Sequence, residues 1–490
     1  MASYRCKACG YIYNERVEDL KFDELLNTWK CPLCGRKKIQ FEIADEFTKK
    51  EINEVINSVT TPYNAVVVNK DNPSIERVDG CINCGICTRT CLAREKMGDP
   101  KFLNCVGCGQ CILTCPKKVL QPKNDIYRFL EAKRNKKICV AYIAPGARVA
   151  IGDKFGYKPG ALLGTKLVGL LKKLGFKYVF DVTFGADLTI MEEATELINR
   201  LNNKGKLPMM TSCCPSWVRY AQIYYPELLD NLSTTKSPIA IEGTVVKNYF
   251  SKIKNIDPRD IFTVAITPCT AKKWEIIDSE VKDTDLVITI HELTEYLNNT
   301  KIDFEKIKRR QFDKLVGMGS GAGLIFGASG GVMEAAIRTA HYLMTGKKLN
   351  KINVNNVRGY NNIKEAQIKM GDKYLNVCVV DEIANALPIL EDVKNNKSKY
   401  DFIEVMNCRG GCIGGGGQPY HSLKDEALIK EKRMSSLYLK DAQMKIRSAY
   451  ANPYVKKIYR EFLDYPNSPK AEELLHRKYV NLSFLNHNNR

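Results

Sequence analysis

Two adjacent cysteines, Cys213 and Cys214 in the stretch Thr-Ser-Cys-Cys-Pro-Ser-Trp, are the residues whose spacing most clearly suggests chemistry. Consecutive side chains in an extended segment point to opposite sides of the backbone, so one thiolate can bind a metal cluster while its neighbour remains free to carry protons. Two further sites follow in Thr-Pro-Cys-Thr-Ala-Lys-Lys and Glu-Val-Met-Asn-Cys-Arg-Gly-Gly-Cys. Together, Cys214, Cys269, Cys408 and Cys412 supply the four thiolates that a cubane iron-sulfur cluster requires.

A second group of cysteines repeats the pattern Cys-x-x-Cys-x-x-Cys-x-x-x-Cys within residues 73–125. In this pattern three close cysteines surround one cubane and the fourth crosses to the other cluster. We therefore expect two 4Fe-4S clusters. Their predicted ligands are Cys81, Cys84, Cys87 and Cys115 for one cluster, and Cys105, Cys108, Cys111 and Cys91 for the other. The segment resembles a bacterial two-cluster ferredoxin of α+β fold, and it would conduct electrons.

Residues 1–45 carry two Cys-x-x-Cys pairs, which predict a four-sulfur site of Cys6, Cys9, Cys31 and Cys34. The spacing alone permits zinc or iron. The sequences Cys-Gly-Tyr-Ile-Tyr and Trp-Lys-Cys-Pro-Leu-Cys-Gly resemble a rubredoxin, although much of the usual loop between the pairs is missing. We expect one mononuclear iron, with a structural zinc ribbon as the alternative.

The composition favours a soluble redox protein. The 490-residue chain has 19 cysteines and a formal net charge of +20. Cys-x-x-Cys repeats without a secretory signal indicate metal ligation rather than disulfides, and the lack of a membrane-length apolar run predicts a cytoplasmic protein. Because ligating thiolates are anions, the charge with metals bound is nearer to about +12. This basic balance favours an acidic electron carrier, and no basic run interleaved with aromatic residues indicates nucleic acid.

The remainder of the chain reads as a linker, an α/β domain and a helical end. A charged helix and linker are expected at residues 46–72 and a hinge helix near residues 123–137. Residues 136–420 alternate buried strands with helices, and residues 421–490 continue as a helical region of the same domain. Strands are predicted at residues 138–143, 178–182, 264–266, 286–290 and 377–380, and a helix at residues 161–174. Cys139 and Cys378 lie inside such strands and are interpreted as core residues.

A predicted helix at residues 188–200 carries three glutamates. The sequence Thr-Ile-Met-Glu matches a capping box and would make Glu192 a partner of the helix N-terminus. Glu193 and Glu196 are three residues apart and share a face, which on an arbitrary helix is more often a solvated acidic face. The glycine-rich residues 319–331 lack the spacing of a nucleotide-binding loop and are expected to allow close packing beside a bulky cofactor. No histidine or Ser/His/Asp pattern suggests hydrolysis.

The three cysteine motifs, in this order, make the chain similar to the iron-iron (FeFe) hydrogenases. Asp-Leu-Thr-Ile-Met-Glu-Glu at residue 187, Ser-Gly-Ala-Gly at residue 320 and Gly-Gly-Val-Met-Glu-Ala-Ala at residue 330 also match, so the resemblance runs from about residue 71 almost to the end. It implies an α/β catalytic domain, an anaerobic oxidoreductase that interconverts H2 with protons and electrons, dedicated maturation proteins, and a ferredoxin-type electron carrier.

The resemblance also implies an H-cluster: a cubane on Cys214, Cys269, Cys408 and Cys412, joined through Cys412 to a two-iron unit with CO, cyanide and an azadithiolate. Cys213 would relay protons through Glu193, Ser233 and Glu196, and a thiol suits this task when its pKa is brought near neutral. Lys272 would pair with a cyanide and Met406 would pack against the two-iron unit. Pro145, Gly146 and Thr267 are also assigned to the surroundings of the cofactor.

Three positions depart from common members of the family: Thr267 replaces a methionine, Gly146 replaces a small hydroxyl residue or alanine, and Ile239-Ala240 stands where glutamine is common. Two alternatives remain. One is an H2 sensor with low turnover, but sensors tend to replace the relay cysteine and to append signalling domains. The other is a non-catalytic iron-sulfur assembly protein that lacks the two-iron unit.

Overall fold

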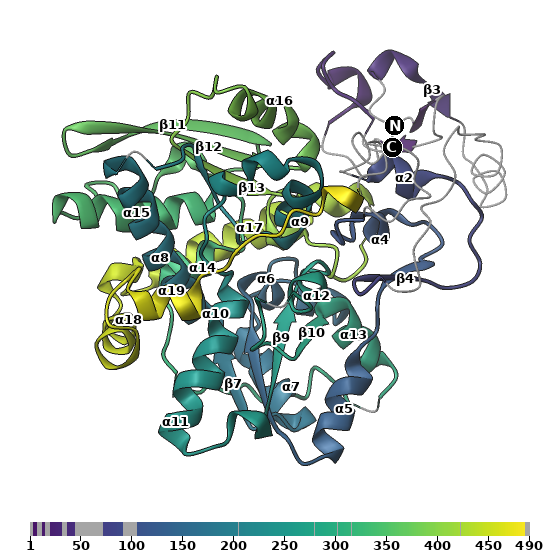
Figure 1. Ribbon diagram of the computed structural model, residues 1–490. Helices are drawn as coiled ribbons and strands as arrows, with labels where there is room; N and C mark the ends of the chain where they lie inside the picture. The colour runs from purple at the N-terminus through teal and green to yellow at the C-terminus, as the bar shows by residue number, and fades with distance from the viewer. Residues whose placement is uncertain are drawn as a thin grey trace.

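The computed structural model describes residues 3–6, 12–14, 20–31, 37–44, 72–91 and 105–485, the last range without residues 204, 279, 301, 315 and 422. The helix and linker expected at residues 46–72 lie outside the described residues, apart from residue 72. From residue 126 onward the chain forms two sheets with helices around them, and the described cysteine-rich residues 72–91 and 105–122 lie to one side of both (Figure 1).

The first sheet has four parallel strands in the order β10-β9-β6-β7. Parallel sheets are covered on both faces, which is why these strands read as continuous apolar runs. All four were predicted from the sequence, and the structure confirms them. Their bounds are β6 (Ile138–Ile143), β7 (Tyr178–Asp181), β9 (Ile261–Thr267) and β10 (Leu286–Thr289).

Successive side chains of β6 point to opposite faces of the first sheet and pack in two separate apolar clusters. Cys139, Ala141 and Ile143 pack with α5 (Ile126–Arg134), α7 (Gly164–Leu174) and α13 (Ile290–Asn298) on one face. Val140 and Tyr142 face the opposite side and pack with α8 (Thr183–Asn202) and α10 (Pro238–Val245). The prediction that Cys139 is a core residue is confirmed, because its side chain is buried within the first of these clusters.

The second sheet has the order β11-β12-β13-β8, and the sequence indicated only its β12. Its bounds are β8 (Met209–Met210), β11 (Ile363–Met370), β12 (Lys373–Asp381) and β13 (Phe402–Met406). Strand β11 is antiparallel to β12, and the other pairs are parallel. One face packs on α9 (Pro215–Tyr224) and α16 (Ile383–Lys394), where Cys378 is fully buried as predicted. The other face packs on α8 and α15 (Gly331–Thr345).

The helix predicted at residues 188–200 begins earlier, and the capping-box interpretation of Glu192 is wrong. Helix α8 starts at Thr183, whose backbone N–H donates to Asp181 Oδ1 at 2.9 Å. Thr189 therefore lies within the helix and donates to Gly185 O at 3.1 Å. Glu192 is fully buried and instead accepts hydrogen bonds from residues near the C-terminal end of the chain: Tyr459 Oη, the backbone N–H of Asn467 and His476 Nε2.

The smaller segments have their own sheets. Strand β4 (Ile75–Arg77) pairs antiparallel with β5 (Leu120–Pro122), and the helices α2 (Ile86–Thr90) and α4 (Gln110–Thr114) belong to the two cysteine repeats. At the N-terminus a three-stranded sheet has the order β2-β1-β3, with strands β1 (Ser3–Cys6), β2 (Ile12–Asn14) and β3 (Phe41–Ala44). The aromatic rings of Tyr4, Tyr13, Phe22, Trp29 and Phe41 contact one another in this segment.

The C-terminal region is helical. It contains α17 (Glu426–Gln443), α18 (Pro453–Ile458) and α19 (Pro469–Leu475). The remaining short helices are α6 (Pro145–Arg148), α11 (Ser251–Lys254), α12 (Lys272–Glu275) and α14 (Gly321–Ile325). Across the described ranges, none of the helices has both the length and the apolar character needed to span a bilayer.

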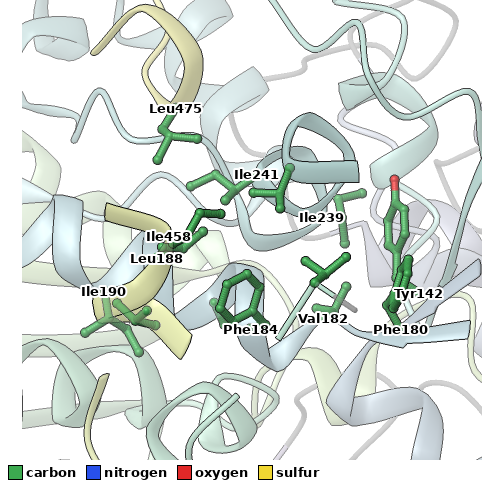
Figure 2. Packing of buried hydrophobic residues seen from close by; sticks show 14 of the residues in the cluster. Tyr142, Phe180, Val182, Phe184, Leu188, Ile190, Ile239, Ile241, Ile458 and Leu475 are labelled. Carbon is green, nitrogen blue, oxygen red and sulfur yellow. The ribbon is translucent and has the colours of Figure 1, made fainter. Parts of the chain in front are cut away.

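Phe184 tests the contribution of this core to stability. Figure 2 shows its ring within the cluster that joins α8 and α10, and the side chain is fully buried. Phe184→Ala should lower the free energy of unfolding by about 3–5 kcal/mol, because it leaves a cavity that the surrounding helices fill only in part. Urea denaturation followed by tryptophan fluorescence measures this. The matched control is Phe484→Ala, since Phe484 is 70% exposed, and an equal loss in both variants would contradict the packing described.

Candidate metal centre

The cysteine-bearing loops all follow the carboxyl ends of parallel strands. Cys213 and Cys214 come directly after β8, Cys269 after β9, and Cys408 and Cys412 after β13. In α/β proteins these ends are where ligands bind. The fold therefore brings thiols from three distant parts of the chain to the junction between its two sheets.

The two adjacent cysteines differ in their surroundings, as expected from their alternation. Cys214 lies at the N-terminal end of α9 in an extended conformation. Its thiol interacts with that of Cys269, and the thiols of Cys408 and Cys412 both interact with Cys214 and Cys269. The strongest electrostatic neighbour of Cys213 is instead Glu193. Four thiols thus form one group, and the fifth is directed to a carboxyl group.

The chemistry of this donor set fits a cationic cluster. Burial raises the pKa of all four grouped thiols, that of Cys269 to about 11, and repulsion between the thiols adds to the effect at Cys269, Cys408 and Cys412. Without a cation, four thiolates could not be held together in this dry site. A metal centre supplies the missing positive charge and deprotonates its ligands. Within the described ranges no three Cys, His, Asp or Glu groups converge on a single-ion position.

Beside these thiols lies a cavity of about 540 Å³. Its walls are almost entirely apolar, and they include all five residues that the sequence assigned to the surroundings of the cofactor: Pro145, Gly146, Thr267, Lys272 and Met406. Cys213, Cys269 and Cys412 also reach it, as do Gly323 and Gly327 from the glycine-rich stretch. The cavity therefore touches both the grouped thiols and the separate one.

Among the described residues that line the cavity, Lys272 is the one with a charged side chain. Its ammonium group donates to Cys213 O at 3.1 Å and to Glu275 Oε2 at 2.8 Å. Burial acts to lower the pKa of Lys272, but the neighbouring Glu275 outweighs it and the pKa is raised, so the side chain stays charged. An ammonium has three N–H groups. No acceptor in the described ranges takes the third, which leaves it for an anionic or polar ligand in the cavity.

The three positions that depart from the common family pattern all touch this cavity. A Cβ atom on Gly146 would lie 3.1 Å from Pro268 Cγ and 3.3 Å from Cys412 O, so glycine lets this wall approach the Cys412 loop closely. The hydroxyl of Thr267 donates to Cys269 O at 3.1 Å and thus serves its own loop. Ile239 presents an apolar side chain. The cavity consequently has fewer polar groups than glutamine at residue 239 would give it.

A line of polar side chains leads away from Cys213. Glu193 is buried, and neither of its carboxylate oxygens has a hydrogen-bond partner in the part of the chain that the structure describes. Burial raises the pKa of Glu193 to about 8, with further contributions from Glu196 and Glu404. Ser233 lies beside Glu193, and its hydroxyl donates to Glu196 Oε2 at 2.7 Å. The order Cys213, Glu193, Ser233 and Glu196 predicted from the sequence is thus present as neighbouring groups.

The residue at the outer end of this line, Arg200, was not predicted from the sequence. Arg200 Nη2 donates to Glu196 Oε1 at 2.6 Å, and both side chains are close to the surface at 13% and 10% exposure. Their i,i+4 spacing was the signal that could have identified the pair. The expectation of a near-neutral thiol also requires correction: burial raises the pKa of Cys213 well above its ordinary value, and among the main contributions only Lys272 lowers it.

The ferredoxin-like cysteines separate into the two sets that the spacing predicts. Cys81, Cys84, Cys87 and Cys115 line a single cavity of about 370 Å³, although Cys115 lies 28 residues after Cys87 in the chain. In the other set, the thiols of Cys91 and Cys105 both raise the pKa of Cys108 and Cys111, after the larger effect of burial. Of the N-terminal four-sulfur site, Cys31 is buried, the Cys6 backbone lies in β1, and Cys9 and Cys34 are outside the described residues.

Comparison with protein families gives three matches. Residues 137–416 match the iron only hydrogenase large subunit, C-terminal domain. Residues 427–482 match the iron hydrogenase small subunit, and residues 3–41 match rubredoxin. The first match spans more than half of the chain and includes every loop of the metal centre.

Individual proteins give the same result. The chain is 37% identical over 497 residues to iron hydrogenase 1 of Clostridium pasteurianum, covering 95% of this chain and 86% of that protein. A solved structure of an [FeFe]-hydrogenase from Chlamydomonas reinhardtii superposes with a TM-score of 0.64 at 35% identity, covering 73% of this chain and 98% of the other. A cytosolic Fe-S cluster assembly factor of Danio rerio is more distant, at 28% identity, with 73% of this chain and 91% of that protein covered.

The assignment of Cys115 to the same cluster as Cys81 can be tested by measuring the iron content of variants. Cys115→Ser should reduce the bound iron by about four atoms per chain. Its residual electron paramagnetic resonance (EPR) spectrum should match that of Cys81→Ser and differ from that of Cys108→Ser. Cys139→Val, which removes a thiol from a strand in the core, is the control and should retain all the iron. A Cys115→Ser spectrum that matches Cys108→Ser would reverse the assignment.

The raised pKa of Glu193 predicts a pH-dependent stability. Between its ordinary value of about 4.5 and about 8, the folded protein keeps a proton that the unfolded chain has released, so the stability from this group is lost as the pH rises through that window. Glu193→Gln should therefore gain stability over the wild type from pH 5 to pH 9, as measured by urea denaturation. Glu473→Gln, at an exposed position, is the control. Parallel pH curves for wild type and Glu193→Gln would disprove proton retention at Glu193.

Proposed function

This chain belongs to the iron-only (FeFe) hydrogenase family, and we propose how its own residues carry out the reversible reaction of two protons and two electrons to give H2. The observation that carries the proposal is a group of four thiols beside a cavity that two of them, Cys269 and Cys412, reach together with the separate thiol of Cys213 and the ammonium group of Lys272. The chain is an oxidoreductase with iron-sulfur chemistry.

Cys214, Cys269, Cys408 and Cys412 would hold the cubane of the H-cluster, and the cavity beside Cys412 would enclose its two-iron unit. When bound, this cofactor supplies the iron that binds H2, a basic amine, and the route for electrons. Lys272 would direct its third N–H towards a cyanide ligand, and Met406 would fill space against the two-iron unit. The apolar walls from Pro145, Gly146 and Thr267 would exclude water from the bound cofactor.

The proposed proton path consists of buried side chains, most of which can gain or lose a proton. Cys213 keeps its proton at rest, because burial opposes the thiolate. Glu193, with a pKa raised to about 8, is also protonated near neutral pH and can both give and accept a proton there. Ser233 links it to Glu196, which is ion-paired with Arg200 near the surface. This order takes a proton from the buried thiol to solvent in short steps.

Electrons would travel through the two ferredoxin-like clusters. The loop of the second cysteine repeat contacts the catalytic domain, and the thiols of Cys108 and Cys408 are close enough to repel one another. The cluster of Cys91, Cys105, Cys108 and Cys111 is therefore the medial one, next to the H-cluster. The cluster of Cys81, Cys84, Cys87 and Cys115 is the distal one, with Cys81 exposed at the surface. The rubredoxin-like site, with iron or zinc on Cys6, Cys9, Cys31 and Cys34, would be a further entry or exit point.

The physiological setting follows from charge and cofactor chemistry. A formal charge of +20 favours an acidic carrier such as a ferredoxin as the electron partner. Reduced thiolate clusters favour the cytoplasm and an anaerobic organism. The two-iron unit would be installed by hydrogenase maturation proteins, because this chain provides ligands for it but no enzyme that makes CO or cyanide.

The two alternatives are less well supported. A sensor with low turnover would be expected to lack Cys213, which is present and lies beside Glu193. A non-catalytic assembly protein would lack the two-iron unit, whereas this chain keeps a cavity of about 540 Å³ beside Cys412. The named assembly factor is also the more distant relative.

The proposal is tested by H2 evolution from reduced methyl viologen, with infrared spectra of the same matured protein. Turnover of tens per second or more, with CO and cyanide bands, is expected. Cys213→Ala should keep these bands and lower turnover by several orders of magnitude, on the scale of 10²–10⁴-fold for a lost proton-transfer group. Cys214→Ala should lose the bands, because it removes a cubane ligand.

The matched control is Cys378→Ala, which deletes a buried thiol from the core of the second sheet and should retain activity. Near wild-type turnover in Cys213→Ala would refute the relay. Bands without turnover in the wild type would favour a sensor, and absence of both would favour an iron-sulfur carrier.

A further inference from the structure

The second cysteine repeat and the cubane loops touch through their backbones. Thr270 Oγ1, one residue after Cys269, donates to Gly107 O at 2.6 Å. A Cβ atom on Gly416 would lie only 2.4 Å from Cys108 O, so no side chain fits between the two loops there. A side chain that reaches from one loop to the other must therefore lie within this close backbone contact.

Gln110 crosses this contact from the ferredoxin-like side. It lies between Cys108 and Cys111 as the first residue of α4, and it is 7% exposed. Its Nε2 donates to Cys408 Sγ at 3.3 Å and to Gly414 O at 3.0 Å. Both N–H groups of the amide are thus directed at acceptors of the catalytic domain, which fixes the side of the amide that faces the sulfur.

Asn407 stands at the same contact on the catalytic side. It precedes Cys408 and is fully buried, and within the described residues neither atom of its amide makes a hydrogen bond. The amide nevertheless lies close enough to the Cys108 sulfur to lower the pKa of that thiol, although burial raises that pKa more strongly. The backbone N–H of Asn407 likewise acts to lower the pKa of Cys214. A buried amide without another partner is costly unless it meets an acceptor, and a cluster thiolate is such an acceptor.

We propose that Gln110 and Asn407 form a reciprocal pair of amides, each donating to a cysteine sulfur of the opposite cluster, and that the pair sets the relative reduction potentials of the medial cluster and the H-cluster cubane. This inference rests on the proposed function, and it makes both side chains positioning residues for electron transfer. The sequence signals neither of them, because each depends on a contact between segments about 300 residues apart.

The physical basis is the charge gained on reduction. One electron leaves the medial cluster and one electron is gained by the cubane, so the negative charge on the sulfurs moves across the contact. A hydrogen bond to a ligand sulfur stabilises the reduced state of that cluster and raises its potential. Gln110 therefore favours the electron on the cubane, whereas Asn407 favours it on the medial cluster.

Potentiometric titration of the matured enzyme tests the pair. The CO and cyanide infrared bands report the H-cluster, and EPR reports the medial cluster. Gln110→Leu should lower the potential of the cubane and leave that of the medial cluster nearly unchanged. The equilibrium constant for electron transfer to the cubane should fall about tenfold, the scale of one hydrogen bond to a charged group, which is about 59 mV for one electron. Asn407→Leu should lower the medial potential instead.

Gln222→Leu is the matched control, because Gln222 is equally buried at 6% exposure but donates to Val480 O at 3.0 Å. It should move neither potential. If Gln110→Leu does not fold, Gln110→Glu keeps the shape but places a carboxylate at the sulfur, and it should lower the cubane potential further. Intact infrared bands with unchanged potentials in the Gln110 variant would overturn this inference alone. Absent bands in the wild type would overturn the proposed function and the inference with it.

Discussion

The burial of several thiols at one point is the constraint on which the rest of the structure depends. Four cysteines are placed after strands of two different sheets, where burial opposes their ionisation. Only a cationic cluster makes such a site stable, so assembly of the cofactor and stability of the site are linked. The same burial raises the pKa of Cys213 and Glu193 and favours their protonated forms, which is the state that the proposed proton relay needs near neutral pH.

Helix α8 connects this centre to both halves of the catalytic domain. It contributes to the core against the first sheet and to that against the second, so it is held in place from two sides. Its three glutamates have three different environments. Glu192 holds the C-terminal helices through Tyr459, Asn467 and His476, whereas Glu193 and Glu196 face the line that leads from Cys213 to Arg200. The helix therefore serves packing and also carries two residues of the proposed proton path.

The backbones of the ferredoxin-like segment and the catalytic domain approach each other closely, and this contact matters both for packing and for the proposed electron transfer. A side chain on Gly109 would lie 2.6 Å from Thr270 Oγ1, and its positive φ of +70° also favours glycine. Hydrogen bonds such as Ser216 Oγ to Val106 O hold the segments together at the same place. Electron transfer falls steeply with distance, so in the proposed function the packing that joins the two segments would also determine where electrons pass between them.

The sequence by itself indicated the candidate ligands and the general architecture. The spacing of the cysteines predicted which thiols belong together, including the crossing of Cys115, because ligand spacing follows from the geometry of the cluster. Apolar runs predicted all of the first sheet, and burial of Cys139 and Cys378 followed from their strands. Only the tertiary structure decided that Glu192 anchors the C-terminal helices, that burial raises the pKa of Cys213, and that Gln110 reaches Cys408. These properties depend on segments that are distant in the chain, and pKa and side-chain orientation respond to what surrounds a group in space rather than to its neighbours in sequence.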